Sequence, residues 1–183
     1  QEGYDYTDTD GKRVVDVPNA VERIADHVFF NNKNIDKVVL SNYLKTIDDC
    51  AFMDCSVKEI IMPKTMSSIG VSAFNRTRIT SMDIPEGITK IENYFMHSTP
   101  IQHITIPDSV TEIGSYAFYN CTELNQVVLP ETIVSIGEYA FNECRSLENF
   151  KVPPQVTEIK SLTFCESGLK DISLHNEITS LGK

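Results

Sequence analysis

A short motif returns along the whole chain at nearly constant spacing. The segment IGSYAF at residues 113–118 reappears 23 residues later as IGEYAF at residues 136–141. Alignment on its last residue gives one phenylalanine per unit, at Phe29, Phe52, Phe74, Phe95, Phe118, Phe141 and Phe164. Successive units are therefore 21 to 23 residues long, with seven complete units and the start of an eighth. Repetition at this period indicates a stacked architecture, because one such unit cannot bury its own apolar face.

Each unit also contains a short alternating segment. An apolar-x-apolar triplet followed by proline, as in Val127-Val128-Leu129-Pro130, predicts a half-buried β-strand in each unit. The proline ends that strand because it has no amide hydrogen to donate. Glycine precedes the Ala-Phe pair in several units, at Gly70, Gly114 and Gly137. We expect these glycines to occupy a turn with an unusual backbone angle.

Stacking of the units predicts a solenoid that is mainly β. Equivalent side chains then lie above one another, and the strands join into one parallel sheet. Neighbouring strands lie ~4.8 Å apart, so seven coils predict a body roughly 35 Å long. No stretch shows a sustained helical period, and proline recurs once per unit from Pro63 to Pro153.

The repeat resembles a known family. Residues 110–130, VTEIGSYAFYNCTELNQVVLP, look like the BspA-like, or Treponema-type, leucine-rich repeat, and the resemblance extends over about residues 18–183. It implies a right-handed stack with a parallel β-sheet on its concave face and mostly loops and turns on its convex side. Members of the family are typically secreted or surface-anchored proteins of host-associated bacteria, and several are adhesins. The family has no shared catalytic residues, so the resemblance implies no enzyme.

The two ends of the chain differ from the repeat. Residues 1–17 predict a hairpin that turns at Asp10-Gly11 and caps the first coil, leaving residues 18–183 as the solenoid. The chain stops at Lys183, partway through the eighth unit. We expect that the native protein continues beyond this point, or that the uncapped end associates with a second copy end to end.

Charge and hydropathy exclude several classes of partner. Sixteen Lys and Arg face twenty-six Asp and Glu, a net charge of −10, which disfavours nucleic acid and anionic membrane surfaces. No run of eighteen apolar residues occurs, so we expect no membrane insertion. The first residues do not form a signal or transit peptide, although a signal could precede them in the natural protein.

Sites for cofactors and metals are not apparent in the sequence. Cys55, Cys121 and Cys144 share one repeat position with Thr77 and Ser98, which favours core packing over a disulfide or metal ladder. The acidic start, with Asp8, Asp10 and Gly11, matches an EF-hand loop poorly, because Tyr6 and Val17 occupy two ligand positions. The four histidines lack metal-binding spacing, and there is no P-loop or dinucleotide motif. We therefore predict no cofactor, no metal and no catalytic residues.

Three tyrosines, Tyr94, Tyr116 and Tyr139, lie at or near one repeat position. If their ring faces were exposed, they would form a platform for a sugar or a peptide. The interpretation that we favour is a row of half-buried aromatic rings on the convex side.

The concave sheet is the candidate binding surface. Strand alternation turns two rows of side chains outward, and solenoids bind extended ligands on such surfaces. The candidate binding residues are Lys37, Val39, Glu59, Ile61, Ser81, Asp83, His103, Thr105, Gln126, Val128, Asn149, Lys151, Asp171 and Ser173. Val39, Ile61 and Val128 are apolar residues on a face expected to meet water, which indicates a contact patch. An acidic row also follows the prolines, at Glu86, Asp108 and Glu131, and a cation or a basic partner would relieve its repulsion.

The sequence thus predicts a non-catalytic adhesion module of a bacterial cell-surface or secreted protein. Its expected partner is a protein of a host cell, a neighbouring cell or the extracellular matrix, bound on the concave sheet. Two alternatives remain open: recognition of a glycan, and a structural spacer that displays another domain.

Overall fold

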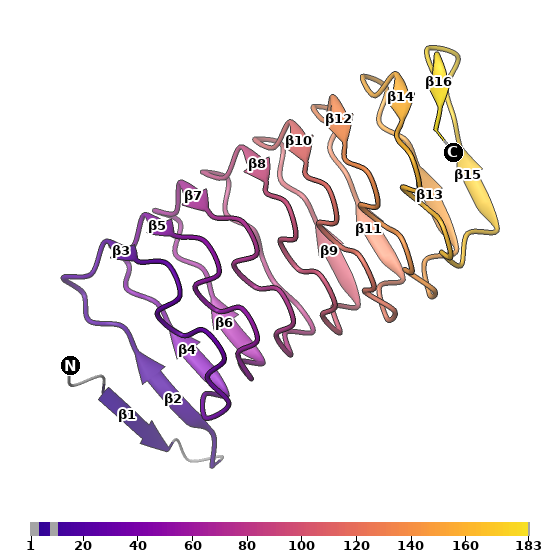
Figure 1. Ribbon diagram of the computed structural model, residues 1–183. Helices are drawn as coiled ribbons and strands as arrows, with labels where there is room; N and C mark the ends of the chain where they lie inside the picture. Colours follow the sequence, from indigo (N-terminus) through magenta and orange to yellow (C-terminus); the bar gives the residue numbers. More distant parts are fainter. Residues whose placement is uncertain (1–3, 8–10, 183) are drawn as a thin grey trace.

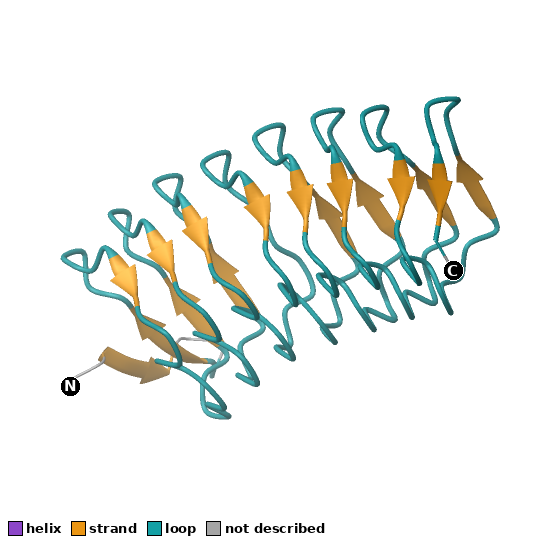
Figure 2. Cartoon of the chain, turned by 45° about the horizontal axis from the view of Figure 1, so that its top comes forward, coloured by secondary structure: helices purple, strands orange, loops and turns teal. Residues whose placement is uncertain are grey.

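The chain forms an elongated solenoid of strands and turns. The computed structural model describes residues 4–7 and 11–182, and these residues contain strands and turns but no helix (Figure 1). The coils, each of which is one turn of the solenoid, contribute strands to two rows that run along the long axis, and the coil of residues 81–91 contributes to one row alone among the described residues (Figure 2). The mainly β solenoid expected from the repeat is confirmed.

The first row consists of three-residue strands and is called here the long-strand face. It comprises β4 (Lys37–Val39), β6 (Glu59–Ile61), β9 (His103–Thr105), β11 (Gln126–Val128), β13 (Asn149–Lys151) and β15 (Asp171–Ser173). The paired strands are parallel and in register, so that Lys37 lies beside Glu59 and Val128 beside Thr105. At the N-terminal end, β2 (Arg13–Asp16) pairs in parallel with β4, and β1 (Tyr4–Thr7) pairs with β2 in antiparallel fashion.

The second row consists of two-residue strands that the sequence did not predict. It comprises β3 (Arg23–Ile24), β5 (Thr46–Ile47), β7 (Ser68–Ile69), β8 (Lys90–Ile91), β10 (Glu112–Ile113), β12 (Ser135–Ile136), β14 (Glu158–Ile159) and β16 (Ser180–Leu181). In the first seven of these strands, the isoleucine side chain points into the core and is buried. The recurring isoleucine of the repeat therefore belongs to a strand and not to a loop.

The third side of each coil is the turn that contains the Ala-Phe pair. Hydrogen bonds between these turns link each coil to the next. At each of the six boundaries between successive turns, three backbone amides donate to carbonyls of the next coil, as Phe52 N does to Ala73 O at 2.9 Å. Two residues of every turn adopt left-handed angles, and the fourteen non-glycine residues concerned have φ between 53° and 59°. Since such angles are costly for L-residues, the ladder of hydrogen bonds between coils must hold each turn in place.

The sheet expected to be continuous is instead divided. Strands of the long-strand face form three groups, β1-β2-β4-β6, β9-β11 and β13-β15. Residues 81–83 run between β6 and β9 without strand pairing to either, among the residues that the structure describes. The prediction of one uninterrupted parallel sheet was therefore wrong, because the turn ladder alone links all the coils.

The fourth complete unit is shifted by one residue from its predicted alignment. The amide of Phe74 bonds to the carbonyl of Phe95, whereas the amide of Met96 bonds to that of Ala117. Phe95 therefore takes the alanine position of its turn, and Met96 takes the phenylalanine position. The small side chain three residues later is correspondingly Thr99, which is buried, and not Ser98.

The core is a column of aromatic rings inside the coils. Phe118 and Phe141 stack at 5.4 Å with their planes 8° apart, while Phe95 meets Phe74 at 5.7 Å and 90°. The perpendicular contact follows from the register shift, because Phe95 enters the column from the alanine position. The residues Phe52, Phe74, Phe95, Phe118 and Phe141 are all fully buried.

The glycines at the start of the turn have a different role from the one expected. Gly70, Gly114 and Gly137 do not have positive φ, and the left-handed angle falls two residues later in each case. A Cβ added to Gly114 would lie 2.6 Å from the backbone nitrogen of Asn93 in the preceding coil. Glycine is therefore present because the coils approach closely, and not because of its backbone angle.

Candidate interaction surface

The fourteen predicted binding residues all lie along one side of the solenoid. Twelve occupy the strands of the long-strand face, and Ser81 and Asp83 lie in the unpaired segment between β6 and β9. Eleven are exposed, and Lys37, Val39 and Glu59 are half-buried. The side chains of Ile61 and Val128 are 60% and 46% exposed, although both are apolar. This surface therefore exposes two apolar side chains, one on β6 and one on β11, among polar neighbours.

Charged side chains at the N-terminal end of this surface neutralise one another. Glu59 accepts hydrogen bonds from Lys37 Nζ at 2.6 Å and from Lys12 Nζ at 3.2 Å. These two lysines, Lys37 first, lower the pKa of the Glu59 carboxyl. The arrangement fixes the Lys37 and Glu59 side chains across β4 and β6, so this part of the surface is preorganised.

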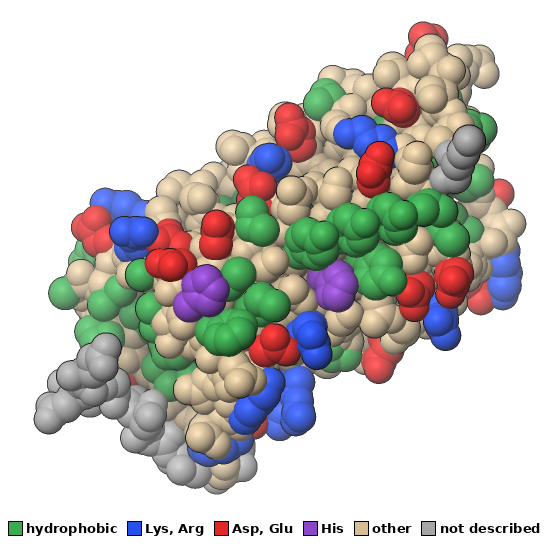
Figure 3. Space-filling model, in the orientation of Figure 1, with side chains coloured by type: hydrophobic (Ala, Val, Ile, Leu, Met, Phe, Trp, Pro, Cys, Tyr) green, Lys and Arg blue, Asp and Glu red, His purple; other side chains and the backbone are tan. Residues whose placement is uncertain are grey.

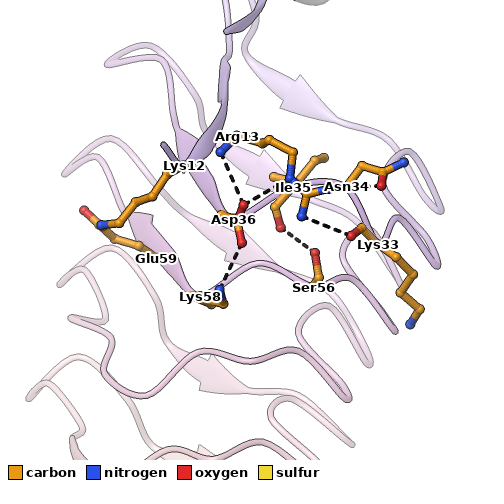
Figure 4. A network of polar contacts seen from close by, with 9 residues as sticks. All are labelled: Lys12, Arg13, Lys33, Asn34, Ile35, Asp36, Ser56, Lys58 and Glu59. Atoms are coloured by element: carbon orange, nitrogen blue, oxygen red, sulfur yellow. Dashed lines mark hydrogen bonds and ion pairs between the residues drawn. The ribbon is translucent and has the colours of Figure 1, made fainter. Parts of the chain in front are cut away.

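A second charged cluster links three coils beside the first (Figure 4). Asp36 accepts from Lys58 Nζ at 3.0 Å through one carboxylate oxygen and from Arg13 Nε at 3.1 Å through the other. Hydrogen bonds from Lys58 and then from the Arg13 backbone and side chain lower the pKa of Asp36 from 3.8 to about 2. The cluster ties β2, β4 and β6 together at their starting ends.

Three adjoining hollows lie along this side of the solenoid, the first and third at the opposite ends of the strands and the second along the length of β6. The first, of about 490 Å³, is lined by Asp16, Val17, Pro18, Asn19, Val39, Leu40, Asn42, Ile61, Met62 and Pro63. The second, of about 220 Å³, lies between residues 58–62 and residues 81–83. The third, of about 410 Å³, is lined by Met62, Lys64, Asp83, Ile84, Pro85 and Glu86. Met62 lines all three, and neighbouring hollows also share Ile61 or Asp83, so the hollows adjoin across successive coils and are together called the groove.

The sequence predicted only part of this groove. Val39, Ile61, Ser81 and Asp83 were in the predicted set, but Met62 was not, because alternation placed it on the buried side. Met62 is half-buried and borders every hollow. Its neighbour is the unpaired segment 81–83, and no feature of the local sequence distinguishes that segment from a paired strand.

The tyrosines form a ladder whose ring faces cover one another. Tyr94 and Tyr116 stack at 4.8 Å, and Tyr116 and Tyr139 stack at 4.6 Å, with planes within 7° of parallel. All three side chains are half-buried, which confirms the interpretation favoured from the sequence. Hydrophobic side chains form a band along the long axis of the molecule on the face seen in Figure 3. Since both faces of Tyr116 and one face each of Tyr94 and Tyr139 are covered, the ladder offers no continuous row of open ring faces on which a sugar could stack.

The cysteines are free, and those of the shared repeat position pack in the core. Cys55, Cys121 and Cys144 are at most 1% exposed. Cys121 Sγ lies 3.1 Å from the carbonyl oxygen of Met96, and Cys144 Sγ lies 3.2 Å from that of Phe118. Burial raises the pKa of the Cys121 thiol to about 11, so it is not a nucleophile at neutral pH. The interpretation of these residues as core packing is confirmed.

Groupings of three or more His, Cys, Asp or Glu that could hold a metal ion are absent from the described residues. Asp8 and Asp10 of the EF-hand-like segment lie outside those residues. Nor does any described part of the chain form a helix with the length and hydropathy needed to cross a bilayer.

Comparison with known proteins identifies the repeat. The family model of the BspA type leucine-rich repeat region matches six copies, over residues 6–125 and 111–183. The chain belongs to the BspA-type leucine-rich repeat family. No protein with a curated description matches it.

Solved structures of bacterial proteins share the fold. A leucine-rich repeat protein from Eubacterium ventriosum aligns with a TM-score of 0.68 and 21% identity over 92% of this chain and 55% of its own. The leucine-rich repeat protein of T. pallidum aligns with a TM-score of 0.61 and 21% identity over 98% and 83%. A leucine-rich cell surface protein of Faecalibacterium prausnitzii aligns with a TM-score of 0.58 and 20% identity over 98% and 70%. The chain thus spans about half the length of the Eubacterium protein, and at these identities the likeness shows the fold alone.

Proposed function

We propose that this chain is a non-catalytic protein-binding module of a bacterial surface or secreted protein, and that it serves in adhesion to a host or neighbouring cell. The observation that carries the proposal is the long-strand face. It presents exposed polar and apolar side chains, including Ile61 and Val128, on a backbone held by the turn ladder. A partner can bind such a surface without the cost of ordering loops.

Two further observations support a surface or extracellular location. The chain belongs to the BspA-type repeat family, and one protein of similar fold is described as a cell surface protein.

The charge of the chain supports a protein partner. Its net charge of −10 favours basic or neutral protein partners over nucleic acid.

The alternatives are less well supported by the geometry. A glycan site on the tyrosine ladder would need open ring faces, and the faces of Tyr116 are covered on both sides. A spacer role would not require exposed Ile61 and Val128 on an otherwise polar face.

A binding screen with matched variants tests the proposal. The purified chain is applied to immobilised matrix proteins, to intact host and bacterial cells, and to a glycan panel. The variant Ile61→Glu with Val128→Glu should lose binding by about tenfold or more, because buried apolar anchors dominate protein interfaces. Val134→Glu is the control, since Val134 is 45% exposed but lies beside β12, away from the long-strand face.

The outcomes separate the hypotheses. Binding to a protein ligand that is lost in the double variant and kept in the control supports the proposal. Equal binding by all three proteins would move the site away from this face, binding to glycans alone would favour the lectin alternative, and no binding to any surface would favour the spacer. Circular dichroism and thermal melting establish that each variant is folded.

A further inference from the structure

We propose that the groove centred on Ile61 and Met62 receives an extended segment of a partner protein that carries aliphatic side chains flanked by lysine or arginine. This inference rests on the proposed function, because it names the kind of protein segment that the long-strand face would bind.

Apolar side chains line each hollow of the groove. Val39, Leu40, Ile61, Met62 and Ile84 line its three hollows, and Ile61 is 60% exposed. From the coil of Asp16 to the coil of Asp83, the groove crosses three coil spacings, or about 14 Å at the usual separation of strands. This length fits about four residues of an extended chain, which allows two aliphatic side chains to face the floor.

Unpaired backbone groups border the middle of the groove. Within the described part of the chain, residues 81–83 make no backbone hydrogen bond to β6 or to β9. The side of β6 opposite β4 is likewise without a strand partner. A segment that crosses the coils runs across β6 and does not add to it as a strand, so these groups are available to it as single hydrogen-bond donors and acceptors.

The charges around the groove favour a basic segment. Asp16, Asp83 and Glu86 make no ion pair with any described residue, in contrast to Glu59 and Asp36, which are each neutralised by two cations. Lys64 is the basic side chain on the rim of the third hollow. The acidic row continues beyond the groove with exposed Asp108 and Glu131. An acidic segment would therefore be repelled, and a lysine or arginine beside the aliphatic residues would be attracted.

A peptide selection tests the inference while the natural partner is still unidentified. A library of random twelve-residue peptides displayed on phage is selected on the immobilised chain, and the enriched peptides are sequenced and measured by fluorescence polarisation. We expect enriched peptides to combine aliphatic residues with net positive charge. Ile61→Glu should weaken their binding about tenfold or more, and Val128→Glu, the same change on the same face outside the groove, should leave it within about twofold.

A second pair of variants examines the charge. Asp83→Asn with Glu86→Gln should weaken the enriched peptides about threefold to tenfold and reduce the dependence of binding on salt. Glu158→Gln is the control, because it removes an exposed carboxylate on β14, away from the groove. Absence of enrichment, enrichment of acidic or neutral peptides, or equal binding by the Ile61→Glu protein would each overturn the inference.

Failure of this inference can be told apart from failure of the proposed function. If the binding to surfaces described above is abolished by Val128→Glu alone and is unaffected by Ile61→Glu, the long-strand face is a binding surface but the groove is not its site. If the chain binds no surface and selects no peptide, both are wrong.

Discussion

The Sγ of Cys121 lies 3.1 Å from the carbonyl oxygen of Met96, one coil back along the stack. Cys144 has the same relation to Phe118, at 3.2 Å. Met96 therefore occupies the position of phenylalanine in its coil. The two cysteine thiols donate hydrogen bonds to backbone carbonyls of the preceding turn that face the interior. In Thr77, the hydroxyl at the same position donates to the carbonyl of its own coil, at Phe74.

The burial of these cysteines predicts their reactivity. In the native protein at mildly alkaline pH, a water-soluble thiol reagent should label Cys50 and Cys165, which are partly exposed. The other three cysteines should not react, because their side chains are fully buried. All five should react after unfolding without a reductant. Spectrophotometric titration with an aromatic disulfide reagent measures the number of thiols that react in the native protein and in the unfolded protein. If all five react only after a reductant is added, a disulfide has formed and the prediction is wrong.

The register shift predicts a coupling between two adjacent residues. Phe95→Ala alone should lower the free energy of unfolding by about 3 to 5 kcal/mol, because it leaves a cavity. Met96→Phe alone should lower it by about 1 to 3 kcal/mol through overpacking. The double variant restores the Ala-Phe pair of the other coils, so its cost should be far smaller than the sum of the two. Denaturant unfolding checks this, and additive costs would contradict the shifted register.

Left-handed turn residues predict a stabilising substitution. Glu166 is exposed and has a φ of 53°, an angle that costs an L-residue more than it costs glycine. Glu166→Gly should therefore raise the free energy of unfolding by about 0.5 to 1 kcal/mol. The control Glu158→Gly, on strand β14, should lower it by a similar amount. A loss of stability in both variants would contradict the strain assigned to the turn.

The Asp36 cluster predicts a dependence on pH. The folded protein lowers the pKa of Asp36 from 3.8 to about 2, so its contribution is complete above about pH 5 and is lost as the pH falls through 3.8 and then through about 2. Asp36→Asn should thus lower the free energy of unfolding by about 1 kcal/mol at neutral pH, and the difference should become small near pH 2 and vanish below it. Thermal unfolding of both proteins across this range measures the effect, and a difference independent of pH would assign it to packing.

The repeat made the solenoid, the outward rows of the long strands and the burial of Cys121 predictable from the sequence. Each depends on periodicity, which records which side chains face the interior. The position of Phe95 was mispredicted because the alignment followed the phenylalanines alone. The core isoleucine lies five residues before the phenylalanine in the other six units but only four before Phe95, and this spacing is the signal that was missed. The hydrogen bonds between coils show that Met96, five residues after Ile91, takes the phenylalanine position.

The groove was only partly predictable for a related reason. The triplet Met82-Asp83-Ile84 alternates like Ile104-Thr105-Ile106, yet only the second includes a paired strand. Pairing depends on the distance between coils, and that distance is set by the whole stack. The exposure of Met62 beside the unpaired segment is likewise a property of the assembled coils.

A steric block tests most directly whether the long-strand face is the recognition surface. In a Cys50→Ser, Cys165→Ser background, Ile61→Cys, Val128→Cys and Val134→Cys each provide one exposed thiol, and each is coupled to a maleimide carrying a bulky polyethylene glycol chain. Binding of the three conjugates to the ligand found in the surface screen is then measured beside the uncoupled proteins. If partners bind the long-strand face, the polymer at residue 61 or at residue 128 abolishes binding and the polymer at residue 134 does not. Full binding by the conjugates at residues 61 and 128 would contradict recognition on this face.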